Sequence, residues 1–139
     1  TKWDERFIEL AELVGSWSKD PSTQVGAVIV DTNNRIVSIG FNGFPKGVKD
    51  TEERLLDKDK KYAIVVHAEA NALMFANSSV EGCTLYTYPF QPCSRCAGLI
   101  IQSGIKRIVS ISNNNKNWEE NFKLSRQLFK ESGIILEYV

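Results

Sequence analysis

The chain has 139 residues, with 17 Lys and Arg against 17 Asp and Glu, so its formal net charge is zero. This length is that of about one domain, and 42% apolar with 24% charged residues excludes a disordered chain. A nucleic-acid binder needs a basic surface to neutralise phosphates, so zero net charge favours a small ligand. We expect one domain spanning residues 1–139 and no nucleic-acid partner.

We expect no targeting signal in this sequence. No apolar run approaches the ~20 residues of a membrane-spanning helix, and the charged first residues lack the apolar core of a signal peptide. The three cysteines are an odd number, and two of them form a Cys-x-x-Cys motif. Such a motif is typical of metal or redox chemistry in a reducing compartment, so we expect a cytoplasmic protein with no membrane partner.

The first elements are a helix and a β-hairpin. Residues 3–18 are predicted to be helical, because apolar side chains recur there at the spacing of one helix face. These are Trp3, Phe7, Leu10, Val14 and Trp17. Residues 25–30 and 35–41 predict two strands joined by a turn, and the turn-forming residues 42–47 predict a loop.

A charged stretch follows at residues 46–61, with six basic and five acidic side chains. It is either a solvated flap or an ordered lid that contributes charge to a phosphorylated ligand.

Helices and strands alternate in the rest of the chain. The predicted helices cover residues 67–75, 92–104 and 118–132, and the predicted strands cover 83–88, 106–112 and 134–138. Together with the hairpin, this order predicts a three-layer α/β fold, in which a mixed five-stranded sheet has helices on both faces.

Four residues suggest metal chemistry. His67 is the one histidine of the chain, Glu69 follows two residues later, and Cys93 and Cys96 form the Cys-x-x-Cys motif. Residues three apart share a helix side, and a helix N-terminus stabilises thiolates. One imidazole and two thiolates give three protein ligands and an open fourth position, which is the pattern of catalytic zinc. Glu69 can shuttle the protons of a water held there.

Other interpretations of these residues exist. A Cys-x-x-Cys motif alone can be half of a structural zinc site or a redox pair, and a lone histidine is usually a core or surface residue. Cys83 lies in a predicted strand and is interpreted as a small buried apolar residue.

These residues are similar to the zinc nucleobase deaminases, whose signature is His-x-Glu followed by Pro-Cys-x-x-Cys. The chain resembles the cytidine deaminase-like superfamily and, within it, the deoxycytidylate (dCMP) deaminases. The matching segments are SKDPSTQVGA at 18–27, GFNGFPKG at 40–47, HAEANA at 67–72, PCSRCA at 92–97 and IIQSGI at 100–105. The first two of these segments favour dCMP over other substrates.

The resemblance implies hydrolytic deamination of dCMP to dUMP and ammonia, with one Zn²⁺ per chain bound by His67, Cys93 and Cys96. Glu69 is then the proton shuttle. The resemblance also implies that Asn42 contacts the sugar of the substrate and that the backbone N–H of Ala68 meets the pyrimidine carbonyl.

Regulation is a further implication of the resemblance. Such enzymes are typically homo-hexamers, activated by dCTP and inhibited by dTTP, with Mg²⁺ accompanying the triphosphate. The loop containing Asn42, Gly43, Lys46 and Gly47 is the part we expect at the regulatory site.

The phosphate partner and the exact substrate stay open. Lys19, Lys46 and Arg95 are the candidate cations for a 5′-phosphate, and the sequence does not rank them. Two rival functions are a deaminase of a base in tRNA or single-stranded nucleic acid, or of a free nucleoside, and a zinc module that only binds nucleotides.

Overall fold

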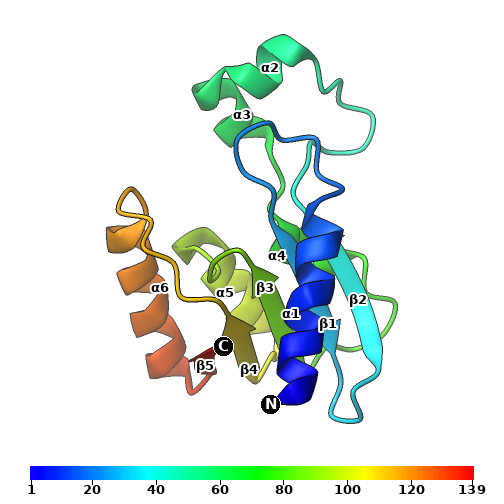
Figure 1. Ribbon diagram of the computed structural model, residues 1–139, viewed down its shortest axis with the longest axis vertical. Coiled ribbons are helices and arrows are strands. Elements are labelled where there is room, and N and C mark those ends of the chain that lie inside the picture. Colours follow the sequence, from blue (N-terminus) through cyan, green and yellow to red (C-terminus); the bar gives the residue numbers. More distant parts are fainter.

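The computed structural model describes residues 1–139 and contains a five-stranded sheet with helices on its two faces (Figure 1). In chain order, the elements are α1 (Lys2–Gly15), β1 (Gly26–Val30), β2 (Ile36–Phe41), α2 (Glu52–Leu56), α3 (Lys58–Ile64), α4 (Ala68–Met74), β3 (Thr84–Tyr88), α5 (Ser94–Ser103), β4 (Arg107–Ser110), α6 (Glu119–Ser132) and β5 (Ile135–Tyr138). The strand order is β2-β1-β3-β4-β5. Strand β1 pairs antiparallel with β2 and β3, whereas β3, β4 and β5 are parallel, which confirms the predicted mixed sheet.

Two apolar clusters bury the two faces of this sheet. Helix α1 covers one face, where Phe7, Ile8 and Ala11 pack with side chains of β1, β3 and β4. Helices α4, α5 and α6 cover the other face, and their contribution includes Ala72, Ile100 and Phe129. All five residues of β1 are buried, because helices lie on both of its sides.

The buried face of α1 differs from the predicted one. The predicted helix over residues 3–18 ends at Gly15, so Trp17 lies beyond it. Trp3 and Trp17 share the predicted apolar face but are 48% and 51% exposed, whereas Asp4 is buried. The helix lies so close to β1 that a Cβ atom on Gly26 would overlap the carbonyl oxygen of Ala11. Small and medium side chains suit this contact.

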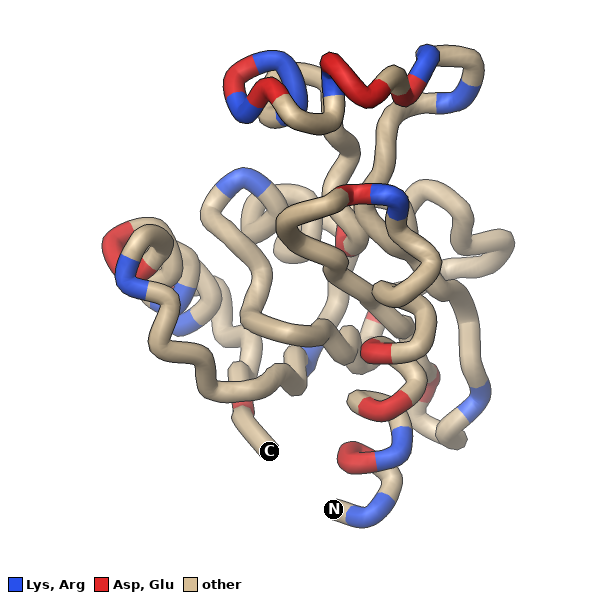
Figure 2. The backbone as a smooth tube through the Cα atoms, turned by 45° about the horizontal axis from the view of Figure 1, so that its top comes forward, with Lys and Arg blue, Asp and Glu red and all other residues tan.

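The charged stretch forms two short helices, α2 and α3, which project from the sheet (Figures 1 and 2). We call residues 51–64 the cap segment. Most of its charged side chains are exposed, as expected for a solvated flap, but Lys61 is buried. Its Nζ lies 3.1 Å from Asp20 Oδ1 and 2.6 Å from Ser22 Oγ, so the cap segment is fastened to the loop after α1.

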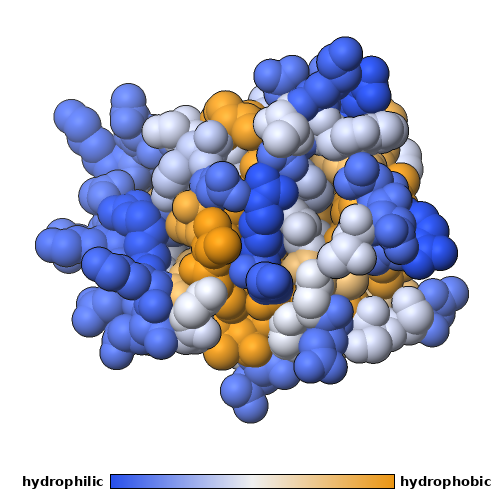
Figure 3. Space-filling view, turned by 90° about the horizontal axis from the view of Figure 1, so that it is seen from below, coloured by the Kyte–Doolittle hydropathy of each residue, from blue (hydrophilic) through white to orange (hydrophobic).

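The surface carries apolar side chains as well as charges. Seen from below, apolar residues gather near the middle of the face, between hydrophilic margins (Figure 3). Edge strand β2 exposes Ile36 and Ile39. None of the helices combines the length and the apolar character needed to span a membrane.

Candidate metal centre and active-site cavity

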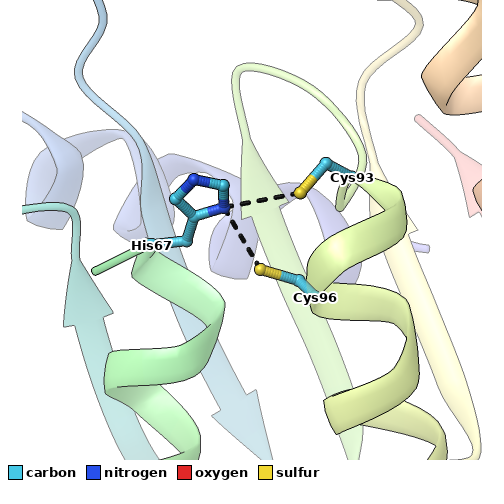
Figure 4. Close-up of side chains that lie close together, drawn as sticks. All are labelled: His67, Cys93 and Cys96. Atoms are coloured by element: carbon cyan, nitrogen blue, oxygen red, sulfur yellow. Dashed lines mark hydrogen bonds between the residues drawn. The ribbon is translucent and has the colours of Figure 1, made fainter. Parts of the chain in front are cut away.

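The starts of two helices bring the three candidate metal ligands together (Figure 4). His67 is the N-cap residue of α4, Cys93 is the N-cap residue of α5, and Cys96 lies in the first turn of α5. The Nδ1 atom of His67 lies 3.4 Å from Sγ of Cys93 and 3.3 Å from Sγ of Cys96. All three ligand atoms lie within 4.8 Å of one another.

This donor set fits a zinc ion. Bond lengths in a tetrahedral zinc site place nitrogen and sulfur ligands about 3.6 Å apart, close to the separations between these side chains. One imidazole and two thiols are ligands that zinc prefers, and no other His, Cys, Asp or Glu belongs to the cluster. The fourth corner therefore has no protein ligand, which distinguishes a catalytic site from a structural one.

His67, Cys93 and Cys96 shift one another's pKa values. A hydrogen bond from Cys96 and the adjacent His67 ring lower the pKa of Cys93 to about 4, although burial opposes this shift. The hydrogen bond with Cys93 raises the pKa of His67. A metal ion that displaces these protons would satisfy the same buried atoms, so the site is prepared for a cation.

Side-chain hydrogen bonds from α6 fix the start of α5. Asn121 accepts from the backbone N–H of Ser94 at 2.8 Å and donates to the Ser94 hydroxyl at 2.9 Å. Gln91 is buried just before Pro92 and Cys93, and its amide makes four hydrogen bonds. It donates to Phe122 O and Ser125 Oγ and accepts from Arg126 and Tyr138. The loop that carries Cys93 is thereby tied to the C-terminal third of the chain.

Glu69 lies in the first turn of α4 and lines a cavity together with His67 and Cys93. Its side chain is buried without a basic partner, and burial raises its pKa to about 7. A carboxyl group with such a pKa can take up and release protons near neutral pH. It does not belong to the ligand cluster.

The cavity is open to solvent, and the space of about 640 Å³ within its outline includes part of that solvent. Four aromatic side chains form part of its wall: Tyr62, Phe90, Trp118 and Phe122. The Tyr62 and Trp118 rings are 6.3 Å apart in an edge-to-face arrangement, so the cap segment contacts the start of α6 there.

The two residues expected at the substrate also line this cavity. Asn42 is buried, accepts from Val25 N at 2.9 Å, and donates to Thr23 O at 3.0 Å and more weakly to Asp20 at 3.4 Å. Its amide protons are therefore engaged, while Oδ1 keeps a free lone pair. Ala68 is the first residue of α4, so its N–H has no partner within the helix.

The expected regulatory residues are not all at one place. Asn42 and Gly43 line a second hollow of about 610 Å³, which also contains Lys19, Asp50 and Trp17. Lys46 lies instead over the Phe75 ring, 4.6 Å from its centroid, and Gly47 has a positive φ of 78° in the adjoining turn. Asp20 and Asn42 line both hollows.

None of the three candidate phosphate-binding cations lines the cavity beside the metal centre. Lys19 pairs with Asp50 at 2.9 Å, Lys46 lies on Phe75, and Arg95 is exposed on α5. Lys61 lines it instead, and the sequence analysis did not single it out. The one signal for Lys61 is its place directly before the apolar run that leads to His67. Ten other charged residues in the stretch 46–61 obscure this signal.

The family profile described as "Cytidine and deoxycytidylate deaminase zinc-binding region" matches residues 1–112. The deoxycytidylate deaminase of Mus musculus is 47% identical over 141 residues, covering 96% of this chain and 77% of the mouse protein. The Aliivibrio fischeri protein called "Uncharacterized deaminase in luxG 3'region" is 46% identical over 137 residues, covering 96% of this chain and 91% of that protein.

A solved structure agrees with these sequence relatives. The dCMP deaminase of cyanophage S-TIM5, in complex with dCMP and dUMP, superposes with a TM-score of 0.80 at 25% identity, over 99% of this chain and 97% of the phage chain. The sequence relatives, the shared fold and the His-Cys-Cys cluster agree: this chain belongs to the cytidine and deoxycytidylate deaminase family.

Proposed function

We propose that this protein is a zinc-dependent enzyme that hydrolyses dCMP to dUMP and ammonia, and that residues 1–139 form one catalytic domain. The observation that carries the proposal is the cluster of His67, Cys93 and Cys96, with a fourth corner free of protein ligands and buried Glu69 in the adjoining cavity. The phage relative that binds dCMP and dUMP supports this choice of substrate.

His67, Cys93 and Cys96 would hold one zinc ion per chain, and the bound ion would lower the pKa of a water molecule. In the net reaction, water oxygen forms a bond to C4 of the pyrimidine, and the bond from C4 to the amino nitrogen breaks. Glu69 accepts one proton from the water and delivers it to N3. It then takes the second proton from the new hydroxyl on C4 and passes it to the departing amine, which leaves as ammonia. The N–H of Ala68 donates to the ring carbonyl.

Asn42 orients the sugar as a hydrogen-bond acceptor. Its amide protons are held by Thr23 and Asp20, so a sugar hydroxyl can only donate to the remaining lone pair of Oδ1. The aromatic wall excludes water from the ring and supplies stacking surface.

We also propose a regulated homo-hexamer in the cytoplasm, activated by dCTP with Mg²⁺ and inhibited by dTTP. The second hollow beside Asn42 and Gly43 supports a regulatory site, because it shares Asp20 and Asn42 with the catalytic cavity. Exposed Ile36 and Ile39 on edge strand β2 support subunit contacts. The thiols of the metal centre need a reducing compartment.

A steady-state assay with zinc-loaded protein tests the function. We expect turnover of dCMP, with a sigmoidal rate curve that dCTP and Mg²⁺ make hyperbolic and that dTTP shifts to higher substrate concentration. A deoxycytidine-containing oligonucleotide and a tRNA anticodon stem-loop are the comparison substrates. Faster turnover of either one would contradict the proposal and favour a nucleic-acid deaminase.

A further inference from the structure

Lys61 occupies a distinctive place in the cavity. Among the 14 residues that line it, Lys61 is the one Lys or Arg. We propose, on the basis of the function given above, that Lys61 binds the 5′-phosphate of the nucleotide and makes the enzyme select a monophosphate over a nucleoside.

The position of its ammonium group is fixed by the fold. Asp20 Oδ1 and Ser22 Oγ each take one of its three protons, at 3.1 Å and 2.6 Å. Its side chain is 6% exposed, and α3 holds the backbone. Nζ makes no third hydrogen bond to the protein and lies 5.8 Å from the centroid of the Tyr62 ring, so its third N–H can serve a ligand in the cavity. An ammonium group held in this way loses little conformational entropy when it binds.

The charge of the ligand requires such a group. A phosphate monoester is an anion, and burying it beside an aromatic wall without a cation is costly. The metal end cannot supply the cation, because two thiolates there offset the charge of Zn²⁺. Lys19, Lys46 and Arg95 lie outside the lining.

Asp20 keeps the site suited to one phosphate group. Backbone N–H groups of Ser22 and Thr23 donate to its carboxylate at 2.9 Å and 3.1 Å, so Asp20 stays in place and ionised. A second or third phosphate group would add negative charge beside this carboxylate with no further Lys or Arg in the lining. The pair of Lys61 and Asp20 therefore favours a monophosphate over a triphosphate as well.

The test compares Lys61→Met, Lys61→Arg and the matched control Lys58→Met on dCMP and deoxycytidine. Lys58 is an exposed lysine of the same helix. We expect Lys61→Met to lower kcat/KM for dCMP about 100-fold, mainly through KM, and to change kcat/KM for deoxycytidine by less than about threefold. Lys61→Arg should restore most of the preference for dCMP, and Lys58→Met should match the wild type.

A binding measurement supports the assay. The product dUMP should raise the Tm of the wild type more than deoxyuridine does, and Lys61→Met should remove this difference. Lys61→Met leaves the Asp20 carboxylate without its lysine partner. The same measurements are therefore made on the double variant Lys61→Met with Asp20→Asn, in which no unpaired charge is buried.

The outcomes separate the two proposals. Two results would overturn the role of Lys61 while leaving the deaminase intact. One is an equal loss of kcat/KM on dCMP and deoxycytidine, and the other is an unchanged preference for dCMP in Lys61→Met and in its combination with Asp20→Asn. A zinc-loaded wild type that does not turn over dCMP would overturn the proposed function and, with it, this inference.

Discussion

Three buried carboxyl groups show how local surroundings set the behaviour of one functional group. Glu69 is buried without a basic partner, so its pKa rises to about 7. The guanidinium of Arg107 holds the pKa of Asp4 well below its usual range. Asp20 combines burial with hydrogen bonds from two backbone N–H groups and Lys61, and its pKa is lowered. Only Glu69 is therefore poised to exchange protons near neutral pH.

Replacement of Glu69 tests its role directly. Glu69→Gln keeps the shape of the side chain but cannot carry a proton, so kcat should fall about 10³-fold while zinc stays at one ion per chain. Turnover of dCMP and metal analysis of the purified variant check this. Exposed Glu81→Gln is the matched control and should retain both activity and metal. Loss of zinc together with activity in Glu69→Gln would instead make Glu69 a metal ligand.

At the scale of elements, close contact between α4 and β2 positions His67 and Glu69. Gly40 of β2 allows this contact, because a Cβ atom there would lie 2.5 Å from both Ala68 O and Ala72 N. The neighbouring atoms are backbone and cannot move aside singly. Close packing of α4 thus explains why the first residue of the segment GFNGFPKG is glycine. The sequence pattern alone does not reveal this reason.

Gly40→Ala should therefore push α4 away from the sheet. We expect a loss of about 3 kcal/mol in the free energy of unfolding and weaker zinc binding, since His67 would withdraw from the two cysteines. Gly98→Ala on α5 is the control. A Cβ atom at Gly98 meets no atom within 4 Å. Gly98→Ala should raise the free energy of unfolding by roughly 0.5–1 kcal/mol, because alanine favours a helix more than glycine does. Urea denaturation and metal titration measure both effects, and a fully stable Gly40→Ala would contradict the packing argument.

For the whole molecule, a partly buried ion pair joins α1 to the sheet. Asp4 on α1 accepts two hydrogen bonds from Arg107 on β4, at 3.0 Å and 2.6 Å, and one from Tyr86 on β3 at 2.6 Å. Arg107 also pairs with exposed Glu137 on β5. This network attaches α1 to three strands of the sheet.

The lowered pKa of Asp4 gives this network a defined pH dependence. Stability from a carboxylate with a depressed folded-state pKa is present above its unfolded pKa, near ~3.9, and declines as pH falls below that value. Asp4→Asn should lower the free energy of unfolding by about 2 kcal/mol at pH 7. The difference from the wild type should shrink by about 1.4 kcal/mol per pH unit below pH ~4.

Urea denaturation at pH 7 and at pH ~3 measures the difference in the free energy of unfolding between Asp4→Asn and the wild type. Glu137→Gln removes the exposed partner of the same arginine and should cost less than about 1 kcal/mol. An Asp4→Asn difference that stays constant from pH 7 to pH 3 would show that the carboxylate charge contributes nothing.

Some features were predictable because their signals lie in short stretches of sequence. Apolar periodicity predicts the helices and strands of the sheet, and the spacing of Cys93 and Cys96 places both thiols at one helix start. The segments around His67 and Cys93 also predicted the family to which the chain belongs.

Other features depend on residues that only folding brings together. Lys61 meets Asp20 across 41 positions of the sequence, and Tyr62 meets Trp118 in the wall of the cavity. The buried face of α1 likewise depends on how closely that helix approaches β1. Local sequence therefore determined the elements and the candidate metal ligands of this protein. Tertiary packing decided which cation, carboxylates and aromatic rings line the cavity beside the candidate metal centre, because burial and long-range pairing are properties of the assembled chain.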